Sequence, residues 1–349
     1  MITILIPFYN QNQYRIRNIK AVVSNYLNNF TDCKVVVVEQ VSMGTKYASE
    51  CFLEFVVDTN FRVYPLQVEG DRFNKSYLIN TAVREYIETD IIMMSDADCI
   101  LPHLSTEYLI THLQGTSIYF PFSKVNFLNE AHTRRLISDK PLIQAAVKQD
   151  HFINRYTGLV NLFTRTTFNA VGGFDESFEG WGGEDDAFVD KCNRIVAPIK
   201  RSIDDTTLIH LYHPKVNTSE YLNTECFTWN KKRVATIRRM PIKRLHSYVE
   251  SLQDGVNVLD DIVREFDRDG KLSFSAEISI GSGTINVDTT VYDIIPKDGR
   301  VELDGILDAV YRTDGPLFLD YIINQIDTKI VDMTEFEKNI VDKYRAMCQ

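Results

Sequence analysis

The sequence predicts an α/β fold: a mostly parallel central sheet flanked by helices, with a smaller α+β region at the C-terminal end. Short β-branched, apolar runs at 2–6 and 34–39 are typical of parallel strands that are buried on both faces. Residues 14–30, between these runs, have apolar side chains at helical spacing. A strand, a helix and a strand within about forty residues form a right-handed βαβ unit.

The ends of these two strands predict a nucleotide pocket, because ligands of open α/β sheets bind at the carboxyl ends of the strands. The first strand leads into Pro7, Tyr9 and Asn10, and the second ends at Glu39. We therefore expect these four residues to contact a nucleotide.

A third strand is expected at 61–65, and Arg72 and Lys75 come before a helix that continues to residue 86. The exposed N–H groups at a helix N-terminus favour anions. The two basic side chains are therefore candidates for binding a diphosphate. The alternative is an ordinary pair of solvated surface charges.

The strand expected at 90–98 ends in Asp96-Ala97-Asp98. Residues i and i+2 of a strand point to the same side, so both carboxylates are expected to face one site. Carboxylate oxygens are suitable ligands for a hard or borderline divalent cation. A D-x-D sequence alone is common, and its place at the end of an apolar strand makes it a stronger signal.

A glycine-rich turn at 180–183 carries Trp181 and leads into Glu184, Asp185 and Asp186. Sugar rings stack on aromatic faces such as that of tryptophan. Neighbouring carboxylates accept hydrogen bonds from sugar hydroxyls, and one of them can take a proton during group transfer. The alternative is a plain helix N-terminus, which also favours acids. Together with the upstream D-x-D, the stretch favours a sugar site.

Two histidines, His210 and His213, lie in a strand expected at 208–214. Their spacing places them on opposite sides of a strand, so at most one is expected to share the cation unless the strand bends. We favour His213. Further elements are expected as strands at 117–121 and 156–163 and as helices at 164–171 and 185–194.

Past Pro241 the pattern changes, and we expect a domain boundary near residue 240. An amphipathic helix is expected at 242–267, strands at 271–303 and one or two helices at 316–347. Residues 241–349 contain no catalytic constellation. The helix at 242–267 is expected to pack on the first domain or on a second subunit.

The composition excludes several classes of protein. The net charge of −10 argues against broad nucleic-acid binding. No apolar run approaches the roughly 18 residues of a membrane span. Residues 1–7 lack the basic start and the cleavage site of a signal peptide. Six scattered cysteines are typical of reduced thiols, so a cytoplasmic protein is expected.

Residues 1 to about 215 resemble the nucleotide-sugar glycosyltransferases of the GT-A fold, which is Rossmann-like. The likeness is strongest to the β-1,4-galactosyltransferases, to chondroitin-polymerase-like enzymes and to family 2 enzymes. Four blocks carry it in the expected order and spacing: 4–10, 72–80, 96–98 and 172–186. The last block, ending Trp-Gly-Gly-Glu-Asp-Asp, is the most specific.

The resemblance implies a cation site and a donor. Asp98 and His213 would hold Mn²⁺ (or Mg²⁺), with Asp96 beside the ribose or the metal. His210 falls where the family has a methionine in the metal strand. The donor would be a UDP-sugar, bound by the first two blocks.

The resemblance also implies inverting transfer of a hexose to an acceptor hydroxyl, with a glycan as the expected acceptor. Asp185 would be the base, Glu184 and Trp181 would bind the acceptor and the donor sugar, and Asp186 would help to bind the acceptor. Tyr156 falls beside the C2 substituent of the sugar and favours UDP-galactose or UDP-glucose over N-acetylhexosamines. Two departures are Ala187, in place of the family's third acid, and residues 241–349, which have no counterpart in the family.

Two other functions stay open. A nucleotide-sugar-binding protein without catalysis is disfavoured by the intact acidic triplet 184–186. A transferase that modifies nucleic-acid bases is permitted by the basic segments 231–233, 238–239 and 243–244, and is weakened by the acidic net charge.

Overall fold

The computed structural model describes most of the chain in two compact units. The first unit comprises residues 1–214 and 237–258, and the second comprises 215–236 and 259–349. Within them the described residues are 1–10, 12–41, 52, 55, 58–68, 70, 72–138, 157–180, 182–214, 225–268, 275–280, 283–288, 307, 323, 326 and 333–348. Tyr156 and Trp181, both expected to contact sugars, lie outside these residues.

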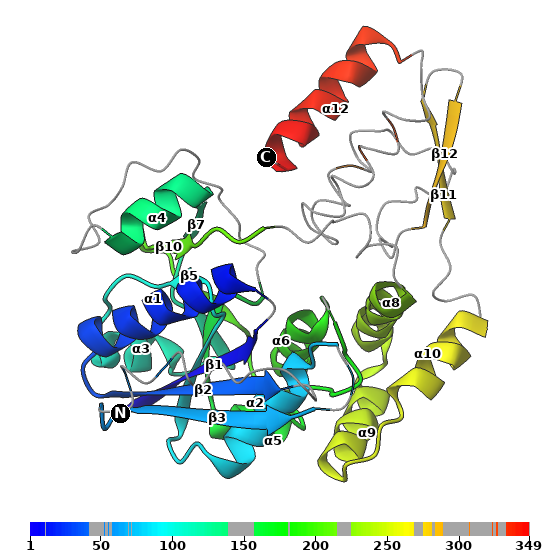
Figure 1. Ribbon diagram of the computed structural model, residues 1–349. Helices are drawn as coiled ribbons and strands as arrows, with labels where there is room; N and C mark the ends of the chain where they lie inside the picture. The colour runs from blue at the N-terminus through cyan, green and yellow to red at the C-terminus, as the bar shows by residue number, and fades with distance from the viewer. Residues whose placement is uncertain are drawn as a thin grey trace. The chain divides into compact units, whose positions relative to one another are not determined.

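A seven-stranded sheet in the order β3-β2-β1-β4-β8-β6-β9 forms the centre of the first unit (Figure 1). Neighbouring strands β3, β2, β1 and β4 are parallel, and β8 runs antiparallel to both β4 and β6. This mixed, mostly parallel sheet confirms the predicted fold class. The strands are β1 Ile2–Tyr9, β2 Cys33–Val41, β3 Phe61–Gln67, β4 Ile91–Ser95, β6 Ile118–Phe120, β8 Val160–Thr164 and β9 Lys200–Arg201.

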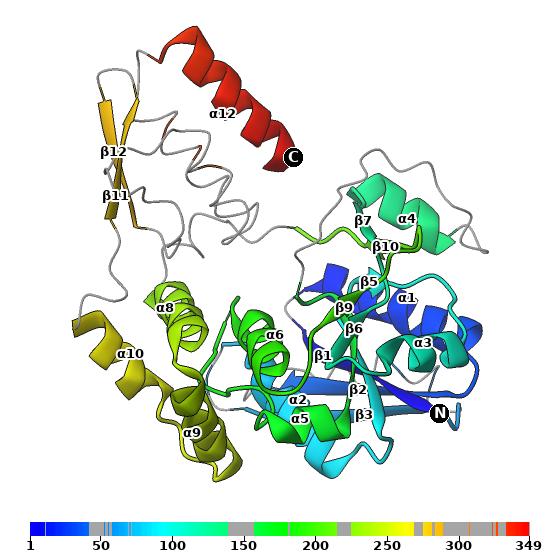
Figure 2. The ribbon, with the colours of Figure 1, turned by 180° about the vertical axis from the view of Figure 1, so that it is seen from behind.

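Helices pack along this sheet (Figures 1 and 2). Side chains cap several of them: Asn12 accepts hydrogen bonds from two backbone N–H groups at the start of α1, and Asn74 accepts one at the start of α2. The apolar stripe of α1, including Val22, Val23 and Tyr26, is fully buried against the sheet. The helices are α1 Gln13–Asn29, α2 Lys75–Glu85, α3 Thr106–Leu113, α5 Arg165–Ala170 and α6 Glu184–Ile195.

A smaller sheet has the strand order β5-β10-β7, and its strand β5 follows β4 in the chain. Its middle strand pairs antiparallel with β5 and parallel with β7, and His210 lies directly opposite Cys99. This pairing brings His210 next to Cys99, the residue that directly follows the D-x-D. The elements are β5 Cys99–Ile100, β7 Lys124–Phe127, α4 Glu130–Ser138 and β10 Thr207–His210.

The amphipathic segment expected as one helix at 242–267 is two helices, α9 Ile242–Gln253 and α10 Leu259–Arg268. The sequence prediction missed the stop signal at Gly255, whose φ of +72° is a backbone conformation that glycine adopts without strain. Helix α9 packs against α6 within the first unit, where Tyr248 donates a hydrogen bond to the buried carboxylate of Asp175. The domain boundary near 240 stays a prediction.

The second unit combines helices and strands, as expected for the C-terminal region. In it Arg233 binds Asp260 through two nitrogens, at 2.7 and 2.9 Å. No helix in the described part of the chain is long and apolar enough to cross a membrane. The remaining elements are α8 Glu225–Arg239, whose last residues belong to the first unit, β11 Ser275–Ile280, its antiparallel partner β12 Gly283–Asp288, and α12 Glu335–Cys348.

Candidate active site

The predicted acidic triplet forms the first turn of α6. Glu184, Asp185 and Asp186 follow Gly183, which precedes the helix with a φ of +98°. The helix dipole stabilises acids at this position, which is the alternative explanation of the triplet as a plain helix N-terminus. The carboxyl groups of Glu184 and Asp185 are nevertheless largely buried, so the dipole alone does not account for them.

Lys75, the first residue of α2, connects this turn to the D-x-D. Its Nζ lies 2.8 Å from Asp185 Oδ2, 3.0 Å from Asp96 Oδ1 and 3.6 Å from Glu184 Oε1, and its side chain is only 8% exposed. Burial alone would lower the pKa of Lys75, but the three surrounding carboxylates raise it well above its ordinary value. The ammonium group is therefore a fixed counter-charge inside the acidic cluster.

The carboxyl groups of the triplet hold their protons more tightly than usual. Burial and the neighbouring Asp185 charge raise the pKa of Glu184 to about 7, against the opposing effect of Lys75. Burial also raises the pKa of Asp185, again opposed by Lys75. Burial raises the pKa of Asp186, and Arg238 and the hydroxyl of Thr157 oppose that shift. Glu184, whose pKa lies at about 7, is thereby suited to proton transfer.

The loop at 157–159 fits around these carboxylates. A Cβ atom on Gly158 would lie 2.3 Å from Asp185 Oδ2, so a larger residue at this position would displace that carboxylate. Thr157 Oγ1 donates to Asp186 Oδ1 at 2.8 Å, and Leu159 N donates to Asp96 Oδ2 at 3.3 Å. The sequence analysis did not single out this loop, because its partners lie far away in the chain.

Asp98 is the centre of a second cluster. Its side chain is 3% exposed, with His210 Nε2 3.6 Å from Oδ1 and His213 Nε2 3.4 Å from Oδ2. Arg15 also forms an ion pair with Oδ2. Burial acts to raise the pKa of Asp98, but His210, Arg15 and His213 together lower it. Burial lowers the pKa of His213, although the Asp98 charge opposes the shift, so the ring favours its neutral, metal-binding form.

Both histidines reach Asp98 because β10 ends at His210. The chain beyond it no longer follows strand alternation, and the two ring centroids are 5.4 Å apart. The bend that the sequence analysis left open is therefore present. Which of the two would bind a metal stays a prediction.

The geometric reason given for the D-x-D was wrong. We expected strand alternation to point both carboxylates to one side, but β4 ends at Ser95 and the motif lies in the following turn. Asp96 pairs with Lys75 and Leu159, whereas Asp98 pairs with Arg15 and the histidines. The turn thus gives the two carboxylates different partners.

The predicted nucleotide residues lie at the ends of β1 and β2. Pro7 and Glu39 lie in adjacent strands, and the Tyr9 ring stacks on Phe73 with centroids 5.8 Å apart. Asn10 directly follows β1 and is half-buried. Arg72 is largely exposed and pairs with Glu179 at 3.6 Å, so it does not share the buried position of Lys75.

A sequence model of the N-terminal domain of galactosyltransferase matches residues 143–214. This segment includes β8, the acidic turn of α6 and both histidines near Asp98. A comparison with curated protein sequences finds no match.

Several solved structures are similar to the chain at low identity. The structure of GalNAc-T7 with UDP, GalNAc and Mn²⁺ is 13% identical, with a TM-score of 0.47. The match covers 77% of this chain and only 57% of that one. A Pyrobaculum calidifontis mannosyltransferase with GDP-Man and Mn²⁺ is 14% identical, with a TM-score of 0.44 and coverage of 76% and 75%.

The catalytic domain of Drosophila β1,4-galactosyltransferase 7, in complex with xylobiose, is 16% identical, with a TM-score of 0.37 and coverage of 64% and 79%. The chain resembles glycosyltransferases of the GT-A fold, as its sequence predicted.

Proposed function

We propose that the chain is a metal-dependent, inverting glycosyltransferase that moves a hexose from a UDP-sugar to a hydroxyl group of a glycan. The observation that carries the proposal is the contact of Lys75 with both Asp185 and Asp96. It joins the acidic turn, which lies within the galactosyltransferase match, to the D-x-D, which lies outside it. Two motifs proposed for one reaction are thereby adjacent in space.

The cluster around Asp98 fits a divalent cation. A buried carboxylate and two imidazoles converge there, and these donor types suit Mn²⁺, with Mg²⁺ as the harder alternative. When bound, such a cation supplies positive charge that stabilises the leaving nucleoside diphosphate. Arg15 holds the Asp98 carboxylate in place from its Oδ2 side.

Asp185 is the proposed base that takes the proton of the acceptor hydroxyl. Lys75 favours its ionised form, while Glu184, with a pKa near 7, keeps its proton for part of the population at neutral pH. A protonated Glu184 donates a hydrogen bond to a sugar oxygen, and an ionised one accepts a hydrogen bond from a hydroxyl group. Asp186, held by Thr157, is proposed to bind the acceptor.

The donor is proposed to lie across the ends of β1 and β2, against Pro7, Tyr9, Asn10 and Glu39. Arg72 is the proposed diphosphate contact at the surface, because Lys75 is occupied by three carboxylates. Trp181 and Tyr156 are proposed to contact the sugars, with Tyr156 favouring an unacetylated hexose. A cytoplasmic location is proposed because the six scattered cysteines of the sequence are typical of reduced thiols.

A panel of UDP-sugars with Mn²⁺ tests the proposal. We expect slow release of UDP from UDP-galactose or UDP-glucose, and faster release when a suitable acceptor is added. UDP binding without turnover of any donor, across a broad acceptor panel, would favour a non-catalytic binding protein. Turnover that requires DNA with hydroxylated bases would assign the acceptor to nucleic acid instead.

A further inference from the structure

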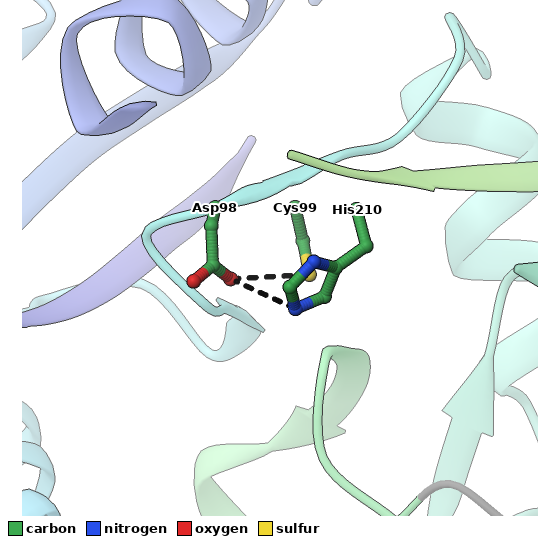
Figure 3. Close-up of side chains that lie close together, drawn as sticks. All are labelled: Asp98, Cys99 and His210. Atoms are coloured by element: carbon green, nitrogen blue, oxygen red, sulfur yellow. Dashed lines mark hydrogen bonds and ion pairs between the residues drawn. The ribbon is translucent and has the colours of Figure 1, made fainter. Parts of the chain in front are cut away.

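We infer that the thiol of Cys99 is a ligand of the cation centre at Asp98, which gives the centre a mixed donor set of carboxylate, thiolate and imidazole from Asp98, Cys99 and His210. Figure 3 shows the three side chains directed toward one another from the turn after β4, from β5 and from β10. The inference deepens the proposed function, because it concerns the cation that the function requires.

The backbone pairing fixes this arrangement. Cys99 in β5 lies directly opposite His210 in antiparallel β10. Directly opposed residues of an antiparallel pair place their side chains on the same face of the sheet. The thiol and the imidazole are thus neighbours by register, and Asp98 is next to Cys99 in the chain.

The distances between the donor atoms match a common cation. Cys99 Sγ lies 3.7 Å and His210 Nε2 lies 3.6 Å from the same oxygen, Asp98 Oδ1. Donors that bind one tetrahedral cation at about 2.0–2.3 Å are roughly 3.3–3.8 Å apart. All three donor atoms lie within 4.8 Å of one another, so a small closure completes the set.

The surroundings support ligation at Oδ1. Arg15 and His213 approach the other oxygen, Oδ2, and so orient the carboxylate with Oδ1 toward the thiol and the His210 ring. Cys99 is fully buried and Asp98 is 2% exposed, so both donors are shielded from solvent. Buried carboxylates are costly unless they are paired or coordinate a metal.

A thiolate ligand changes which cation the centre prefers. Oxygen and imidazole ligands accept Mn²⁺ readily, whereas soft sulfur ligands favour Zn²⁺, Cd²⁺ and Co²⁺. The Cys99 thiolate should therefore contribute more to the affinity for Co²⁺ and Cd²⁺ than to the affinity for Mn²⁺. Substitution of Cys99 should weaken binding of the softer cations much more than binding of Mn²⁺.

The test is titration of the full chain with Co²⁺, followed by absorption spectroscopy. The wild type is expected to show a sulfur-to-cobalt charge-transfer band in the near ultraviolet. Cys99→Ser should lose this band and bind Cd²⁺ at least about tenfold more weakly by calorimetry, with a smaller change for Mn²⁺. Cys33→Ser is the matched control, a buried thiol in β2 away from the cluster, and it should keep the band.

A band that persists in Cys99→Ser, or Co²⁺ bound by the wild type without a band, would overturn the inference. If Cys99→Ser does not fold, X-ray absorption of Zn²⁺-loaded wild type decides, with one sulfur expected at about 2.3 Å. Donor turnover with Mn²⁺ but without a sulfur signal would refute only the thiol ligand. Turnover independent of any divalent cation would refute the metal dependence of the proposed function.

Discussion

Lys75 and Asp185 form a largely buried ion pair in which Nζ lies 2.8 Å from one carboxylate oxygen and 3.1 Å from the other. The two residues are 110 positions apart in the chain, and the pair joins the start of α2 to the start of α6. The same ammonium reaches Asp96 in the D-x-D. Lys75 thus helps to position both the proposed base, Asp185, and the D-x-D.

Replacing Lys75 by methionine should lower both stability and activity. Removal of one partner leaves buried carboxylates without a counter-charge, which costs about 3–5 kcal/mol in the free energy of unfolding. We expect this loss in urea unfolding, and a loss of kcat in donor turnover at temperatures where the variant stays folded. Lys75→Arg keeps the charge and is the control. Unchanged kcat in a folded Lys75→Met would contradict a positioning role for this lysine.

The raised pKa of Glu184 predicts an unusual dependence of stability on pH. The folded state binds this proton up to about pH 7, whereas the unfolded chain releases it near the ordinary glutamate pKa. Between these two values the folded state holds more protons, so stability falls as pH rises. Glu184→Gln should flatten this slope between about pH 5 and pH 7 in urea unfolding. A slope equal to that of the wild type would show that another group causes it.

Gly158→Ala should impair catalysis without straining the backbone, because the φ of Gly158 lies outside the left-handed region. The new Cβ would lie 2.3 Å from Asp185 Oδ2, so the proposed base must move. A displacement of about 1 Å can cost on the order of 10²-fold in rate. Gly115→Ala is the control: nothing lies within 4 Å of its Cβ, and its φ of +73° predicts lost stability without lost activity. Full activity of Gly158→Ala would show that the close fit between Gly158 and the Asp185 carboxylate is not needed for catalysis.

The cation centre predicts that Mn²⁺ and UDP are lost together. Asp98→Ala removes a proposed ligand, and His213→Ala removes either a second ligand or the ring that orients the Asp98 carboxylate through Oδ2. We expect affinity for Mn²⁺ to fall by at least about 10–100-fold in both variants. Calorimetric titration of UDP with and without Mn²⁺ measures both effects. If His213→Ala keeps the metal dependence of UDP binding while His210→Ala loses it, His210 is the ligand.

Local patterns in the sequence predicted the architecture and the types of residue at the site. The β-branched runs of β1 and β2 and the stripe of α1 follow directly from periodicity. The residue types of the D-x-D and of the acidic turn indicated a site, and the resemblance assigned roles to these residues. The contacts between these motifs could not be predicted in the same way. The pairing of Lys75 with Asp185 and the register of Cys99 with His210 depend on how distant segments pack.

Smaller errors of the sequence prediction also arise from contacts between distant segments of the chain. The extent of β4 was overestimated because Asp96 and Asp98 closely follow an apolar run. The chain instead turns after Ser95, where Asp96 N donates a hydrogen bond to the backbone oxygen of Leu159. Gly158 carried no signal, because its importance lies in the carboxylate that approaches it from α6.

Donor turnover by Asp185→Asn tests whether Asp185 is the base of the proposed transfer. The change is isosteric and removes the proposed base, while the donor residues at β1 and β2 and the cluster around Asp98 stay in place. With Mn²⁺ and the donor and acceptor that the wild type uses, we expect UDP to bind with near wild-type affinity and transfer to be abolished. A variant that keeps a kcat close to that of the wild type would contradict the assignment of Asp185 as the base and make Asp186 the candidate.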